Sequence, residues 1–165
     1  ERRHIFLETD DMERQKVRCA LDHGFTALLC VGETEEEKDQ GLSDFVLKRQ
    51  LQIGLADVKA QEMANIWIAY EPVWAIGVAG KPISVGYADE KLQFIRKTLI
   101  KLFGAQAAHI PIFYGGSVNQ ENAVALSQCC EIDGLFIGRS AWNAENFNVL
   151  IRNVLRERQA QKARS

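Results

Sequence analysis

The chain has 165 residues, of which 47% are hydrophobic and 25% charged, a composition typical of a folded protein with one compact core. Its net charge is -2 and its basic residues are scattered, so nothing favours nucleic acid as a partner. No apolar run reaches the about 18 residues that span a bilayer, and the first residues lack the apolar centre of a signal peptide, so we expect a cytoplasmic protein without a membrane segment.

The first half of the chain alternates helical and strand patterns. Capping residues at 9–11 and apolar residues at helical spacing predict an amphipathic helix that Gly24 ends. The run TALLCVG at 26–32 predicts a strand buried on both faces. A helix behind a polar lead-in is expected over 35–60, with Gly54 as an interruption, and NIWIAYEP at 65–72 predicts a second buried strand.

The second half continues the alternation. Helices are expected over 88–102, 118–127 and 147–159, and strands in HIPIFYGG at 109–116 and IDGLFIG at 132–138. Strand and helix thus alternate four times at a repeat of roughly 30 to 45 residues, which predicts a parallel sheet covered by helices.

Two architectures contain such a sheet. A doubly wound sheet places a glycine fingerprint after its first strand, but neither GxGxxG nor GxxxxGK[ST] occurs. A barrel instead places functional residues after every strand, and here CVGE, YEPVWAIG, YGGS and FIGRSAW each follow a predicted strand. We therefore expect an α/β fold of the barrel type, with residues 1–165 in a single domain.

Glu71, in the stretch AYEPVWAIG, follows an apolar strand pattern and precedes Pro72, which fixes the backbone. A carboxylate at the mouth of a barrel could abstract a proton, although a loop glutamate that caps a neighbouring helix fits the pattern too. A rigid, bulky segment is followed by a small, mobile one, as in a loop that closes over a site. The residues concerned are Pro72, Val73 and Trp74 in the first segment and Val78, Ala79, Gly80 and Lys81 in the second.

Two glycine-containing turns could bind a phosphate. Gly115 and Gly116 in YGGS present backbone N–H groups without a Cβ in the way, although a tight turn also explains the pair. Gly138 and Ser140 offer donors one strand later, and phosphate sites of barrels recur after the last two strands. Arg139 could add charge to that site or be a solvated arginine.

Histidine and cysteine suggest no metal site. His4, His23 and His109 share no ligand spacing with a carboxylate or thiol, and Cys129 and Cys130 are adjacent. We expect the cysteines to be buried, reduced thiols and expect no metal.

Together AYEPVWAIG, YGGSV, CVGE and the opening ERR resemble the triosephosphate isomerase family. The resemblance implies a (β/α)₈ TIM barrel that forms a homodimer, needs no cofactor, acts in glycolysis and gluconeogenesis, and interconverts dihydroxyacetone phosphate and glyceraldehyde 3-phosphate through an enediolate. It implies that Glu71 is the catalytic base and that Glu1 is an acid beside the site. The implied substrate-binding residues are Ile76, Gly77, Ser117, Gly138 and Arg139, and the implied lid runs from Pro72 to Gly80, while Cys30 and Glu33 match structural positions.

The sequence departs from the family pattern in several places. A family member begins about 90 residues earlier, so the resemblance implies a partial barrel that lacks roughly the first four strands, together with the family's lysine and electrophilic histidine. The 165-residue chain alone is expected to be inactive. The lid end reads Gly77-Val78-Ala79-Gly80-Lys81, Gly138 precedes Arg139 instead of a second glycine, and Phe136 replaces a smaller residue. These changes leave two alternatives open: an isomerase of a tetrulose phosphate, or a non-catalytic phosphate-binding fragment.

Overall fold

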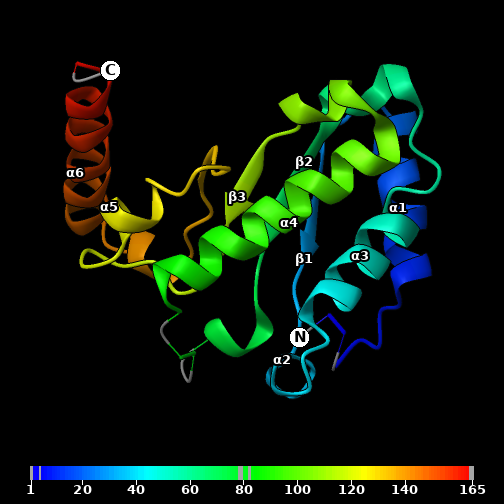
Figure 1. Cartoon of the computed structure of the whole chain (residues 1–165), viewed down its shortest axis with the longest axis horizontal. Coiled ribbons are helices and arrows are strands. Elements are labelled where there is room, and N and C mark those ends of the chain that lie inside the picture. Colours follow the sequence, from blue (N-terminus) through cyan, green and yellow to red (C-terminus); the bar gives the residue numbers. More distant parts are fainter. Residues whose placement is uncertain (1, 4, 78–79, 82, 164–165) are drawn as a thin grey trace.

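The chain forms an α/β structure around a four-stranded sheet in the order β1-β2-β3-β4. The computed structural model describes residues 2–3, 5–77, 80–81 and 83–163 (Figure 1). The strands are β1 (Ala27–Val31), β2 (Ile66–Tyr70), β3 (Ile112–Tyr114) and β4 (Gly134–Leu135). All neighbours pair in parallel, with Leu29 beside Ile68 and Ile68 beside Ile112. The expected parallel sheet is therefore confirmed.

Helices precede, connect and follow the strands, and the sheet is covered from one side. The α-helices are α1 (Asp10–Asp22), α2 (Glu35–Asp39), α3 (Ser43–Gly54), α4 (Val85–Phe103), α5 (Ala123–Leu126) and α6 (Ala144–Lys162). Short 3-10 helices are η1 (Ala60–Asn65), η2 (Val73–Ala75), η3 (Ala105–His109) and η4 (Arg139–Ala141). In Figure 1, α1, α3 and α4 lie along the sheet, whereas α6 stands beside α5 at the opposite end of the molecule.

Local interactions split one of the predicted helices and shorten another. The helix expected over 35–60 is split into α2 and α3, because Gly41 takes a positive φ of 72° after the capped turn that begins at Thr34. The helix expected over 118–127 is reduced to α5, since the Asn119 side chain accepts the backbone N–H groups of Glu121 and Asn122 and holds a turn there.

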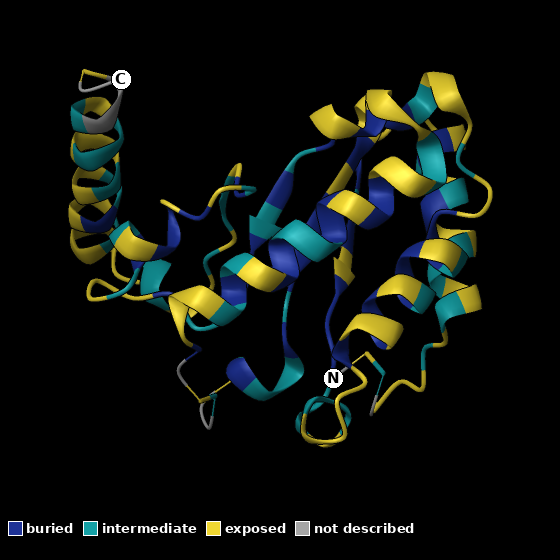
Figure 2. Ribbon diagram, viewed as in Figure 1, coloured by how far each residue is buried: buried dark blue, intermediate teal, exposed yellow. Residues whose placement is uncertain are grey.

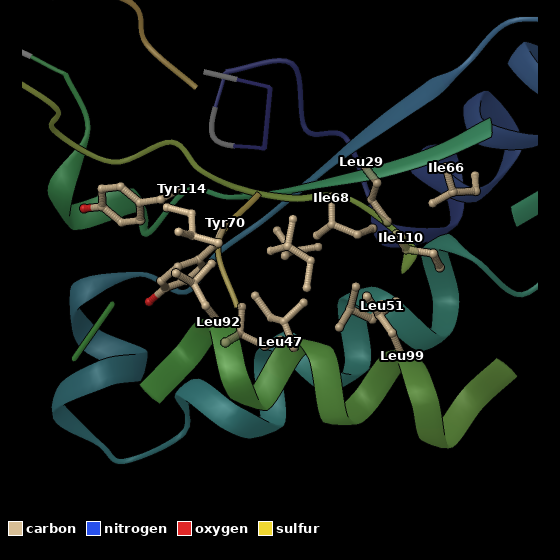
Figure 3. Packing of buried hydrophobic residues seen from close by; sticks show 14 of the residues in the cluster. Leu29, Leu47, Leu51, Ile66, Ile68, Tyr70, Leu92, Leu99, Ile110 and Tyr114 are labelled. Carbon is tan, nitrogen blue, oxygen red and sulfur yellow. The ribbon is translucent and has the colours of Figure 1, made fainter. Parts of the chain in front are cut away.

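The expectation that the first two strands are buried on both faces is wrong. Leu29 and Val31 are buried, whereas the alternate residue Cys30 is exposed and Trp67 in β2 is 42% exposed. The reason is that α1, α3 and α4 pack their apolar side chains against one face only (Figures 2 and 3). On the other face Trp67 packs on Phe113, with ring centroids 5.3 Å apart. β1 therefore alternates between a core face and an open face, whereas in β2 Trp67 is exposed but Ala69, on the same face, is buried.

The cysteines are free thiols, as their positions and spacing suggested, but their burial was predicted incorrectly. All four are free thiols, and only Cys129 is buried. Cys30 is exposed because it lies on the open face of β1, and Cys19 and Cys130 lie on the surface of their segments.

A buried arginine, Arg96, joins the segments that precede β3 and β4. The guanidinium of Arg96 in α4 donates to the carbonyl oxygens of Ala107 at 3.2 Å and Ile110 at 2.6 Å. It also forms ion pairs with Glu131 and Asp133, both at 3.0 Å. Because the Asp133 carboxylate accepts the first N–H of β3 as well, Arg96 fixes where β3 begins.

Replacing Arg96 with alanine should lower the free energy of unfolding by about 3 kcal/mol, because buried carbonyls and a carboxylate would lose their donor. Urea unfolding measures the change, with the exposed Arg152→Ala in α6 as the matched control. Equal effects of the two substitutions would contradict the assigned role of Arg96.

Candidate active site

Glu71 lies at the carboxyl end of β2, where the backbone leaves the sheet. Its N–H donates to the Val31 carbonyl at 2.7 Å, which extends the pairing of β1 and β2 by one residue. A Cβ on Gly32 would lie 1.9 Å from the Glu71 carbonyl oxygen, so only glycine permits this approach. The Glu71 backbone is thereby held against the end of the neighbouring strand.

The YGGS glycines make room for side chains. A Cβ on Gly115 would lie 2.7 Å from Cγ of Glu71 and 3.1 Å from the Phe136 ring. A Cβ on Gly116 would lie 2.0 Å from the Tyr114 hydroxyl oxygen. Gly115 therefore leaves room for the Glu71 side chain against the loop after β3, and Gly116 leaves room for the Tyr114 hydroxyl, a steric role that the sequence did not reveal.

A cavity of about 680 Å³ opens beside Glu71. Val73 and Ile76 line it with Glu71, and Cys30 contributes from β1. The structure thus brings the expected base and the expected apolar contact, Ile76, to the same cavity.

A second carboxylate, Glu33, is fully buried behind the site. It accepts hydrogen bonds from the Tyr70 hydroxyl at 3.1 and 3.2 Å, the Trp74 indole at 3.0 Å and the Tyr87 hydroxyl at 2.9 Å. Burial, reinforced by the Glu33 charge, raises the pKa of Tyr70, so this phenol stays a donor.

Glu33 also fixes the segment that follows Glu71. Its backbone carbonyl accepts the Val73 N–H at 2.9 Å, while its carboxylate holds the Trp74 indole. The Lys38 ammonium lies 4.8 Å from the centroid of the Trp74 ring on the other side of the segment. Sequence reasoning treated Glu33 as structural and missed this role, although its place after a strand in CVGE repeats the placement of Glu71.

The expected phosphate loops lie at neighbouring strand ends. Gly77 has a positive φ of 78°, and its carbonyl accepts a hydrogen bond from the Arg139 guanidinium. The carbonyl of Ser117 accepts from Asn122 at 2.8 Å, and Gly138 immediately precedes η4. Gly77 is thus joined to the loop after β4, and Ser117 and Gly138 belong to the loops after β3 and β4.

Three of the expected site residues, Glu1, Val78 and Ala79, lie outside the described residues. Within the described part of the chain, no three His, Cys, Asp or Glu side chains are grouped as a metal site would require. None of the described helices combines the length and hydrophobicity needed to cross a membrane.

Replacing Glu33 with glutamine should lower the free energy of unfolding by about 2 kcal/mol, because the amide nitrogen would face hydroxyl and indole donors in a buried site. Urea unfolding of this variant and of the exposed Glu36→Gln provides the comparison. A cost equal to that of Glu36→Gln would show that the buried network does not depend on the carboxylate.

The Cys30 thiol should report the charge of Glu71. Although Cys30 is exposed as a residue, its thiol lies in the cavity beside Glu71, where desolvation raises the pKa of Cys30 to about 12, and the charge and hydrogen bonding of Glu71 add to the rise. Glu71→Gln removes a negative charge next to the thiolate, so the pKa of Cys30 should fall and its alkylation by iodoacetamide at pH 8 should become about tenfold faster. Peptide mass spectrometry measures the rate, with Cys130 as the internal control; an unchanged Cys30 rate would contradict this contact.

Known proteins resemble the chain along most of its length. The model of the family "Triosephosphate isomerase" matches residues 1–154. The triosephosphate isomerase of Treponema denticola is 48% identical over 148 residues, which cover 89% of this chain and 59% of that protein. The L-erythrulose-1-phosphate isomerase of Rhizobium etli is 46% identical over 149 residues, which cover 89% of this chain and 54% of that protein. The triosephosphate isomerase of Carboxydothermus hydrogenoformans is 43% identical over 153 residues, which cover 92% and 61%.

The chain therefore spans between 54% and 61% of the length of these curated relatives. The family match includes all four strands, and the parallel sheet with a carboxylate and glycine-rich loops at its carboxyl end agrees with the barrel that the motifs implied. On this evidence, the chain belongs to the triosephosphate isomerase family.

Proposed function

We propose that the full-length protein that contains this chain interconverts dihydroxyacetone phosphate and glyceraldehyde 3-phosphate, an intramolecular oxidation and reduction that needs no cofactor. The observation that carries the proposal is the position of Glu71 at the carboxyl end of β2. Its carboxylate lies over Gly115 and lines a cavity together with Ile76. This is the end of a parallel barrel where catalytic groups are placed.

The proposed chemistry moves one proton between neighbouring carbons. The Glu71 carboxylate takes a proton from the carbon next to the substrate carbonyl, which leaves an enediolate, and returns it to the adjacent carbon. Glu71 is half-buried, and Ile76 adds apolar surface to the cavity beside it, which favours a base that is partly shielded from water once the substrate fills the cavity. Family members supply the lysine and the histidine that polarises the carbonyl from a part of the barrel that precedes the region matched here.

The phosphate is proposed to lie at the loops after β2, β3 and β4. Backbone N–H groups of Gly77, Ser117 and Gly138 would hold it, with charge from Arg139. Glu1 beside the site and a lid over 72–80 complete the proposed set on the basis of family membership. A homodimer, a cytoplasmic location and a role in glycolysis and gluconeogenesis are proposed on the same basis.

A tetrulose phosphate is the second candidate substrate. The Rhizobium etli relative, named as an L-erythrulose-1-phosphate isomerase, is 46% identical to this chain, between the 48% and 43% of the two triosephosphate isomerases reported above. Phe136 is 43% exposed and, like Glu71, lies next to Gly115, and Arg139 contacts Gly77, so these two departures lie beside the proposed position of the substrate. Glu71 would be the base for both candidate substrates, which differ in the number of carbon atoms in the sugar.

Turnover of the two substrates by the full-length protein tests the proposal. Glu71→Gln should lower kcat about 1,000-fold for whichever sugar phosphate is used, because an amide cannot accept the proton. The exposed Glu145→Gln in α6 is the matched control and should retain full activity. Normal turnover by Glu71→Gln would overturn the assignment, and the ratio of kcat/KM for the two sugars identifies the preferred one.

A non-catalytic phosphate-binding role makes a different prediction. Glu71→Asp should cut kcat while leaving the Kd of a phosphate analogue such as 2-phosphoglycolate nearly unchanged, because the shorter side chain withdraws the base without touching the phosphate loops. Equal losses of turnover and of analogue binding would contradict a role of Glu71 as the base.

A further inference from the structure

Arg139 is the residue of the candidate site whose side chain connects two loops. It begins η4, directly after Gly138, and its guanidinium donates to the carbonyl oxygen of Gly77, in the loop after β2. The two residues are 62 positions apart in the chain. Among the described residues, no carboxylate forms an ion pair with Arg139, so its contact with the Gly77 carbonyl is not shared with an acidic partner.

The contact acts on a backbone that no side chain of its own restricts. Gly77 has a positive φ, and among the described residues a Cβ there would meet no atom within 4 Å. Its carbonyl also accepts the Gly80 N–H at 3.3 Å, while the Lys81 N–H donates to the Trp74 carbonyl at 3.0 Å. These bonds close the segment on itself, and Arg139 is the described contact that ties Gly77 to another strand end.

A second bond extends the connection to the loop after β3. The Ser140 hydroxyl, next to Arg139, donates to the Val118 carbonyl at 2.5 Å, and Val118 directly follows Ser117. Hydrogen bonds therefore link Gly77 through Arg139 and Ser140 to Val118. The three loops that carry the proposed phosphate donors form one connected unit.

We propose that Arg139 is a positioning residue that biases the lid, before the substrate arrives, toward the position in which Gly77 lies against the loops after β3 and β4, so that phosphate donors from three strand ends converge. This inference rests on the proposed function and adds a specific role for the Arg139 side chain. A guanidinium suits the role because it remains charged and offers several N–H donors in one rigid plane. A pre-ordered phosphate site lowers the entropic cost of binding the substrate.

The test replaces Arg139 with methionine, which has a similar length but no N–H donor, in the full-length protein. The KM for the preferred sugar phosphate and the Kd for 2-phosphoglycolate should rise about tenfold, while kcat changes less than threefold, because lost pre-ordering weakens ground state and transition state alike. Hydrogen exchange at residues 73–77 should become faster in the ligand-free variant. The exposed Arg156→Met in α6 is the control and should match the wild type in every measurement.

Salt separates positioning from simple attraction of the anion. If Arg139 acts only as a positive charge near the phosphate, the KM of Arg139→Met divided by the KM of the wild type should approach one at about 0.5 M NaCl, because salt screens exposed charges. Positioning by a direct hydrogen bond predicts that the ratio persists. A ratio that disappears in salt, an unchanged KM, or unchanged exchange at residues 73–77 would overturn the proposal.

The measurements also separate this proposal from the function on which it rests. Lack of turnover of both sugars by the wild-type protein would overturn the proposed function. The exchange comparison needs no substrate, so it still decides whether Arg139 holds Gly77.

Discussion

The close approach of two backbones at the end of β1 determines where the rest of the site can lie. Gly32 has no room for a side chain because the Glu71 carbonyl occupies that space. The buried Gln50 side chain from α3 holds Gly32 from the other side, accepting its N–H at 2.8 Å and donating to its carbonyl at 3.1 Å. The next residue, Glu33, then enters the interior and binds the segment that begins at Val73. The close contact between Gly32 and Glu71 thus positions the end of β1, the expected base and the segment that follows it.

The order of strands and helices could be predicted because local sequence patterns mark where each element lies. Apolar runs closed by glycine marked β1, β3 and β4, an apolar run closed by Glu71 and Pro72 marked β2, and capping residues marked the start of α1. The length of α5 was overestimated because the Asn119 side chain holds a local turn where the helix was expected to begin, and the length of β4 because its pairing with β3 is a tertiary effect. Burial on both faces was overestimated for the same reason, because periodicity does not reveal which faces other elements cover.

Individual site residues were easier to propose than their interactions. Glu71, Ile76 and Gly77 could be proposed from one motif that places them after a strand. The hydrogen bond between Glu33 and Trp74 and the one between Arg139 and Gly77 each join residues that are far apart in the sequence, so no local pattern signals them. The glycines of YGGS illustrate the difference: their position was evident, whereas the carboxylate and phenol that require them became visible only in three dimensions.

The uneven packing of the C-terminal part implies a gradient of cooperativity along the fold. β4 has 2 residues, and in α6 Leu150 is the buried hydrophobic residue, whereas α3 and α4 are anchored by many fully buried side chains. Units with few buried apolar contacts open at a lower free energy than the whole molecule. Native-state fluctuations should therefore detach α6 while the sheet from β1 to β3 stays intact. Because η4 lies between these two regions, the loop after β4 is attached to the sheet on one side and to an easily opened helix on the other.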